Sequence, residues 1–285
     1  SRGLGDVYKR QITWCVNDGA CQRLGQCNAF ERVIIKRKRP PKSHVPELRL
    51  DEIPPPPQRL LKDGEVWRCS LTGVGGMGCG VATTILVRAG HKQGYNVQFL
   101  DKKGLAIRNG SVISQIVYTK PASPEQVDKS TTAVIPYGKS DLLIGIDILE
   151  AARAIEPGGR MRHALPERTA AVINTDKITT IKGLAGQEDF DPEHLVEAIR
   201  RSTRQDEFLA RNISRICEKY LGSKVYANVM MLGFAFQKGL LPLSMHSIAW
   251  AIKDTIKADF RKNLYAFNMG RKLVVQPDLF LGPPK

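Results

Sequence analysis

A cluster of glycines in the first third of the chain has the spacing of an anion-binding turn. Gly73, Gly75 and Gly78 satisfy G-x-G-x-x-G directly after an apolar run that ends at Leu71. Glycines permit a tight turn and a close backbone approach, and free amides at the start of a helix favour an anion by about 0.3–1 kcal/mol per charge. Asp101 follows at the distance expected for an acid that binds a ribose hydroxyl. The turn therefore predicts a ligand cleft.

The residues leave three interpretations of this turn open. The spacing to Asp101 favours a dinucleotide. The same amides would equally accept a phosphate of coenzyme A or a neighbouring carboxylate, because any anion is favoured at a helix N-terminus. In the third interpretation the glycines, Gly76 included, only let the helix and the strand pack closely.

Three of the six cysteines are grouped near the N-terminus, as Cys15-x5-Cys21-x5-Cys27. This spacing is too loose for a zinc ribbon, and it is one thiolate short of a closed four-thiolate site. In two-cluster ferredoxin modules one cysteine of each series serves the other cluster, so a missing ligand can lie elsewhere in the chain. The triplet is compatible with part of an iron–sulfur site, and the alternative is unliganded small apolar side chains.

The apolar pattern predicts an α/β fold: a three-layer open sheet with a glycine-rich first turn, followed by a helical C-terminal part. The turn separates a strand from a helix over about residues 81–90, and a second strand ends at Asp101. A βαβ unit of this kind predicts a parallel sheet. Residues 111–119 alternate as a strand with one polar face, and further strands are expected over 141–147 and 169–174. Helical spacing begins at Pro192.

Polar residues close several of these strands. Asp101, Asp147 and Asn174 follow apolar runs, as the glycine turn does. Because the carboxyl ends of parallel strands meet at one edge, we expect these residues to converge there. His91 and His163 have no paired nucleophile in the sequence, and no Ser-His-Asp or metal constellation is apparent. We therefore predict no catalytic residue in this chain.

Composition limits the classes of protein further. The chain has 285 residues, 42% of them hydrophobic, and a formal charge of +15. No apolar run approaches the ~20 residues of a membrane span, and no signal peptide is present, so we expect a cytoplasmic protein without a membrane partner. Basic side chains crowd residues 32–59, but no aromatics are interleaved with them. A solvated or domain-contacting segment is favoured over a nucleic-acid partner.

Five stretches of this sequence resemble a known family, the gamma domain of 2-oxoacid:ferredoxin oxidoreductases, and within it the large fused indolepyruvate type. The resemblance covers roughly residues 67–285. It is carried by GVGGMG at 73–78, DKKGLAIRNGSVISQI at 101–116, SDLLIGIDILEAAR at 140–153, VINTDK at 172–177 and NVMMLGFAFQKGLLPLS at 228–244. The family turn usually has Gln at the position of Met77.

The resemblance implies a piece of a longer oxidoreductase that is not active alone. The reaction it implies is coenzyme A-dependent oxidative decarboxylation of an aryl or other 2-oxo acid, with thiamin diphosphate on other domains and ferredoxin as electron acceptor. The implied partners are the missing N- and C-terminal parts of the same polypeptide, and a homo-oligomer is expected. Cys15, Cys21 and Cys27 would bind an iron–sulfur cluster. The cofactor cleft would be shaped by Gly73, Gly75, Gly76, Gly78 and Asp101.

The same resemblance, with the composition, divides the chain into segments. Residues 1–11 are similar to the translation of a sequencing-library adaptor, with an ordinary polar terminus as the alternative. The expected segments are the tail of an iron–sulfur segment at 12–35, a proline-rich basic linker at 36–62, the gamma domain at 63–256 and the start of a C-terminal helical domain at 257–285.

Two alternatives from other classes remain. One is an NAD(P)-binding Rossmann protein, for which the glycine turn and Asp101 would bind the dinucleotide. The other is a non-catalytic basic interaction module with residues 32–42 as its contact. Binding of nucleic acid that falls steeply with salt would favour the second alternative.

Overall fold

The structure is a computed structural model that describes part of the chain: residues 48–57, 59–104, 110–123, 132–156, 162–180, 183, 186–257 and 259–280. The chain divides into two compact units, 1–42 and 43–285, and the described residues all belong to the second. Cys15, Cys21 and Cys27, and the iron–sulfur segment expected at 12–35, lie outside the described residues. No described helix is long and apolar enough to cross a membrane.

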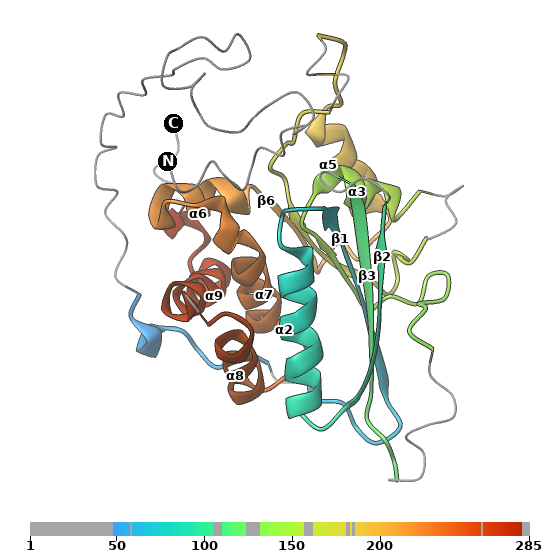
Figure 1. Cartoon of the computed structure of the whole chain (residues 1–285), viewed down its shortest axis with the longest axis vertical. Coiled ribbons are helices and arrows are strands. Elements are labelled where there is room, and N and C mark those ends of the chain that lie inside the picture. Colours follow the sequence, from blue (N-terminus) through green and yellow to red (C-terminus); the bar gives the residue numbers. More distant parts are fainter. Residues whose placement is uncertain are drawn as a thin grey trace, which may run out of the picture. The chain divides into compact units, whose positions relative to one another are not determined.

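A six-stranded mixed sheet forms the centre of the described unit (Figure 1). Its strands, in chain order, are β1 (Val66–Val74), β2 (Asn96–Lys103), β3 (Ser111–Thr119), β4 (Leu142–Gly145), β5 (Ala170–Asn174) and β6 (Phe208–Arg211). Their order across the sheet is β2-β3-β1-β4-β5-β6. The neighbours β1, β4, β5 and β6 pair in parallel, whereas β3 pairs antiparallel with both β1 and β2.

The parallel sheet predicted from the βαβ pattern is therefore wrong in part, because β3 makes the sheet mixed. β1 and β2 run in the same direction, but β3 lies between them. β3 follows β2 after a short connection, so it can turn back and occupy the hydrogen-bonding edge of β1. The three-layer α/β arrangement itself is confirmed.

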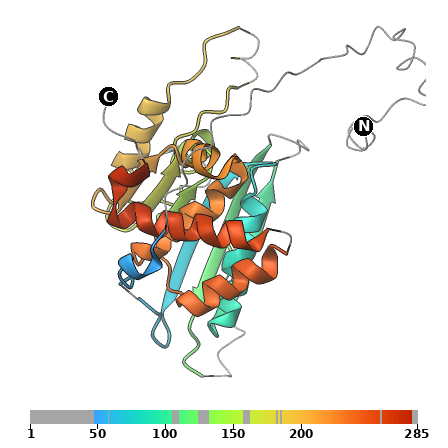
Figure 2. The ribbon, with the colours of Figure 1, turned by 90° about the vertical axis from the view of Figure 1, so that its left-hand side faces the viewer.

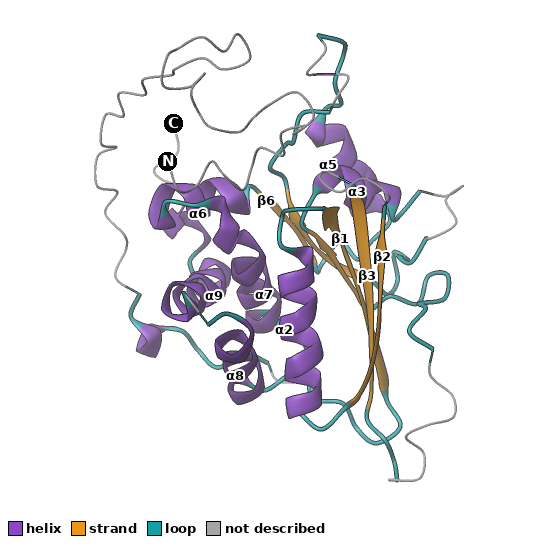
Figure 3. Cartoon of the chain, in the orientation of Figure 1, coloured by secondary structure: helices purple, strands orange, loops and turns teal. Residues whose placement is uncertain are grey.

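Helices cover both faces of the sheet, as Figure 3 shows by colour. One layer contains α2 (Cys79–Lys92), α6 (Ile213–Leu221), α7 (Ala227–Gln237), α8 (Met245–Thr255) and α9 (Phe260–Val275). The other contains α3 (Ile148–Arg153) and α5 (Pro192–Arg201). Short 3-10 turns lie at Leu50–Glu52, Lys224–Tyr226 and Pro277–Phe280. Alternation along the strands explains the two layers: on β4, Leu142 and Ile144 pack in the first core, and Leu143 packs in the second.

The first helical layer is organised around α7, whose residues are all buried. Figure 2 looks onto this layer and shows α9 lying across it. The two helix backbones meet at two glycines. A Cβ added to Gly233 would overlap the Phe267 carbonyl oxygen, and one added to Gly270 would overlap the Met230 carbonyl oxygen. Because α9 packs this closely on α7, it lies in the same compact unit, whereas the sequence placed a domain boundary between residues 256 and 257.

The end of the proline-rich segment is fixed on the same helices. Lys272 of α9 is 2% exposed, and its Nζ lies 2.7 Å from Glu52 Oε2. Gln237 of α7 donates through Nε2 to the Pro54 carbonyl oxygen at 2.7 Å, and Ile53 is buried. The hydrogen bond from Lys272 holds the pKa of Glu52 below its usual value. This part of the expected linker is thus attached to α7 and α9.

Candidate functional site

The glycine turn lies where β1 ends and α2 begins, at the upper end of α2 in Figure 1. The amide of Gly75 donates to the Gly110 carbonyl oxygen at 2.8 Å, which ties the turn to the residue before β3. Gly76 and Gly78 have φ angles of 99° and 82°, a left-handed region that side chains disfavour. Gly78 is also the N-cap of α2. Glycine is therefore required at these two positions by the backbone itself.

The outer side of this turn is open. No described residue accepts a hydrogen bond from the amides of Gly76, Gly78 or Gly80. A Cβ added to Gly76 or Gly80 would have no heavy atom within 4 Å. Unpaired amides at a helix N-terminus favour a negative charge. The turn can therefore accept an anionic group that approaches from outside the chain.

Asn228 of α7 holds the glycine turn through a hydrogen bond. This residue is 5% exposed in the first turn of α7, and its Nδ2 donates to the Met77 carbonyl oxygen at 2.5 Å. A Cβ on Gly78 would overlap Asn228 Nδ2, so the glycine also makes room for this contact. The sequence predicted a helix from Asn228 but gave the residue no part in the site. The signal in the sequence that could have identified Asn228 is its polar side chain at the start of an apolar helix.

Gly73 and Cys79 fit against each other on the inner side of the turn. A Cβ on Gly73 would overlap the Cys79 sulfur and would lie 3.3 Å from Ile146 Cβ. Burial, and then the nearby Asp147 carboxylate, raise the pKa of the Cys79 thiol to about 12. The reactive form of cysteine is the thiolate, so Cys79 is a packing residue at neutral pH.

The polar strand ends do reach the same edge of the sheet, as expected, but they serve the fold there. Asp147 is the N-cap of α3 and accepts the Glu150 amide at 2.9 Å. Burial raises the pKa of Asp147. The Glu150 carboxylate in turn accepts from Ser111 Oγ and from Arg153, each at 2.5 Å. This network joins α3 to the start of β3.

Asn174 has a similar structural role. Its Oδ1 accepts the Ile213 amide at 3.0 Å, at the start of α6. Its Nδ2 donates to Ser214 Oγ at 2.9 Å and to the Ile146 carbonyl oxygen at 3.1 Å. Since both ends of the amide are paired, Asn174 fixes α6 at the sheet edge.

The position of Asp101 argues against the dinucleotide interpretation. Asp101 lies on β2 opposite Ser114 of β3, and Ser114 lies opposite Leu71 of β1. Two strand spacings, about 10 Å, therefore separate it from β1. In a dinucleotide fold the ribose-binding acid follows the strand that is adjacent to the first. Asp101 Oδ1 is buried and has no hydrogen-bond partner among the described residues.

Of the two histidines considered in the sequence, His163 is paired within the fold and His91 lies on the surface. His163 Nδ1 lies 3.1 Å from Ser70 Oγ in the second core, and burial lowers its pKa. His91 is exposed near the end of α2. Among the described residues, no group of three or more His, Cys, Asp or Glu side chains could hold a metal ion.

Two cavities lie away from the turn. One, of about 280 Å³, is a groove between α8 and α9, and the other, of about 30 Å³, lies beside β6.

Comparison with known proteins gives the class to which this fold and open turn belong. Residues 68–273 match the pyruvate ferredoxin/flavodoxin oxidoreductase family, and the chain belongs to this family of oxidoreductases. The match ends within α9 and includes the glycine turn, Asn228 and both helix-contact glycines.

The relatives it matches are subunits of such enzymes. Indolepyruvate oxidoreductase subunit IorB of Archaeoglobus fulgidus is 29% identical over 204 residues, which is 70% of this chain and 91% of that protein. The IorB subunit of Pyrococcus horikoshii is 25% identical over 203 residues, which is 71% of this chain and 93% of that protein.

Two solved structures are similar to this chain at low sequence identity. The gamma subunit of a keto/oxoacid ferredoxin oxidoreductase from Geobacter sulfurreducens has a TM-score of 0.47 at 16% identity, covering 73% of this chain and 98% of that one. The pyruvate oxidoreductase subunit PORC from Thermotoga maritima has a TM-score of 0.48 at 16% identity, covering 73% and 96%.

Proposed function

We propose that the chain is the gamma-type component of a coenzyme A-dependent 2-oxoacid:ferredoxin oxidoreductase, with indolepyruvate or another aryl 2-oxo acid as substrate. The family match over residues 68–273 and the IorB relatives support this assignment. In the complete enzyme, thiamin diphosphate and iron–sulfur clusters would supply the carbon–carbon cleavage and the electron transfer to ferredoxin. The chain acts there as an assembled neighbour of the catalytic parts.

The role proposed for this chain itself is to bind an anionic group at the open side of the glycine turn. The amides of Gly76, Gly78 and Gly80 face no described acceptor, whereas the side chains of Asp147 and Asn174 are used within the fold. A coenzyme A phosphate fits this set of donors, because amides at a helix N-terminus bind phosphate without a cationic side chain. Another part of the enzyme would complete the site over the turn. Gly73, Gly75 and Asp101 would shape its inner wall.

Cluster binding is assigned to the N-terminal cysteines. Cys15, Cys21 and Cys27 are proposed as ligands on their grouping in the sequence and on the resemblance. Cys79 and Cys217 are buried, and burial raises the pKa of each thiol to about 12. Both belong to the first core, and among the described residues no group of three or more His, Cys, Asp or Glu side chains could hold a metal ion there.

A pair of substitutions at Gly80 tests the anion site in the assembled enzyme. Gly80→Asp should raise the KM for coenzyme A at least tenfold more than Gly80→Asn does, because only the aspartate repels a phosphate. A carboxylate in the first turn favours the helix, and the position has open space, so folding should be preserved. The measurement is steady-state turnover against coenzyme A concentration, with thermal unfolding of both variants. Equal KM values for the two variants would refute this use of the turn.

A further inference from the structure

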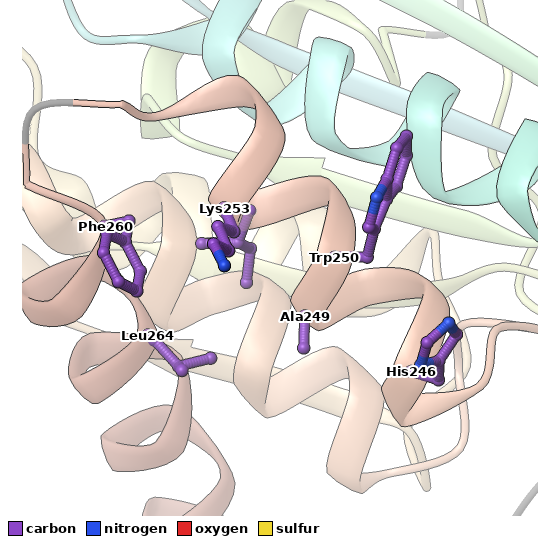
Figure 4. Close-up of a pocket in the computed structure, with 7 residues that line it drawn as sticks. His246, Ala249, Trp250, Lys253, Phe260 and Leu264 are labelled. Carbon is purple, nitrogen blue, oxygen red and sulfur yellow. The ribbon is translucent and has the colours of Figure 1, made fainter.

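The groove between α8 and α9 has the chemistry of a docking site. Figure 4 shows Trp250 of α8 and Phe260 of α9 among the residues that line it, with Ala249 and Leu264 between the helices. The volume is about 280 Å³. Trp250 is 39% exposed. The aromatic and aliphatic side chains that line the groove would bury an apolar side chain of about the size of leucine or phenylalanine.

One charged side chain, Lys253, is among the lining residues of this groove, and it is a cation. His246 and Lys253 stand on α8 beside the apolar walls, and no carboxylate is among the lining residues. Lys92 of α2 lies over the Trp250 ring, with its Nζ 5.3 Å from the ring centroid. Lys253 Nζ lies 5.8 Å from the Phe260 ring centroid. An anionic ligand group could therefore approach the groove without meeting a like charge on its lining.

The nearest carboxylate on α8 is already neutralised. Asp254 accepts from Arg88 at 2.7 Å and from Lys257 at 3.0 Å. These two cations hold the pKa of Asp254 below its usual value, with Lys257 making the larger contribution. Asp254 is therefore paired with other cations of the fold, and Asp259, which precedes Phe260, accepts from Tyr226.

We propose that this groove docks a partner protein through a short segment that carries a leucine or aromatic anchor flanked by Asp and Glu. The groove, at about 280 Å³, is smaller than the pockets of about 300–1,000 Å³ that mostly enclose drug-sized ligands. The chain's own basic segment at residues 32–42 is a poor occupant, since it carries the same sign of charge. A second copy, with its formal charge of +15, is disfavoured for the same reason.

Selection from a random 12-residue peptide library tests this docking site without assuming the partner. The library is panned on the full chain after depletion on the Lys253→Glu variant. The expected peptides combine a Leu, Phe or Trp with flanking Asp or Glu. Their affinity, measured by fluorescence anisotropy, should fall at least tenfold on Lys253→Glu and on Trp250→Ala. It should change less than twofold on Lys139→Glu, which alters the net charge equally at an exposed site in another part of the fold.

Several outcomes would overturn the proposal. Enrichment of neutral or basic peptides, or of none, would show that the groove does not recognise an acidic segment. Equal losses on Lys253→Glu and Lys139→Glu would show only general attraction to a basic protein. Tight binding of indole-3-acetate without peptide binding would make the groove a small-molecule site. Thermal unfolding of each variant confirms that a loss of affinity does not come from misfolding.

Discussion

Replacing Gly233 with alanine is expected to lower the free energy of unfolding by about 3 kcal/mol, at the upper end of the usual cost of overpacking a core. The added Cβ would overlap the Phe267 carbonyl oxygen of α9. A backbone atom cannot rotate away, so α7 and α9 would have to separate. Both helices are extensively buried, and their separation would open the main core. Gly270→Ala should have a similar effect, because its Cβ meets the Met230 carbonyl oxygen.

Urea unfolding measures this effect, with Gly80→Ala as the matched control. Gly80 is also a helical glycine, but its added Cβ would meet nothing within 4 Å. The control should gain about 0.5–1 kcal/mol from the better helix propensity of alanine. If Gly233→Ala and Gly80→Ala had the same stability, the close contact of α7 with α9 would be contradicted.

Replacing Gly73 with alanine is expected to cost about 2 kcal/mol, and Cys79→Ala should recover most of that loss in the double variant. The added Cβ overlaps the Cys79 sulfur, and the next contact, with Ile146 Cβ at 3.3 Å, is tight but tolerable. Removal of the sulfur therefore creates the room that alanine needs. Replacing glycine with alanine also lowers the conformational entropy of the unfolded chain. This effect is the same with Cys79 and with Ala at position 79, so it cancels in the double-mutant cycle.

The test is a double-mutant cycle on unfolding free energies. A coupling of 1 kcal/mol or more between the two sites would support the packing of the glycine turn described above. Additive effects would mean that the turn holds Gly73 and Cys79 apart, and the account of the inner wall would fail.

Most strand positions were predictable from the sequence, but β6 and the strand order were not. β6 lies at Phe208–Arg211, where helical spacing was expected. Apolar runs mark β1, β3, β4 and β5 locally, whereas the insertion of β3 between β1 and β2 depends on pairing that no local pattern encodes. The polar face expected on β3 also misleads. Ser114 and Gln115, on opposite faces, are both buried, and Gln115 Oε1 accepts the Ile135 amide at 2.6 Å. A loop, and not solvent, satisfies that polar side chain.

The candidate site was predictable to a similar extent. The glycine spacing located the turn. The positions of Asp147 and Asn174 at strand ends placed both residues at the same edge of the sheet. Asp147 is the N-cap of α3, and Asn174 accepts from the first amides of α6. These uses could not be foreseen, because the same residue types serve as caps and as ligands. Asn228 was missed because its contact with Met77 joins residues 151 apart in the sequence. Contacts of that range appear only when the helices are packed.

Reconstitution tests the central claim most directly. The chain would be co-expressed and co-purified with the thiamin diphosphate-binding parts of a 2-oxoacid:ferredoxin oxidoreductase from the same source. Coenzyme A-dependent ferredoxin reduction would then be measured with indolepyruvate, phenylpyruvate and pyruvate. The account predicts a stable complex whose turnover requires the chain and is fastest with an aryl 2-oxo acid. A catalytic part that neither binds the chain nor depends on it for turnover would contradict the account.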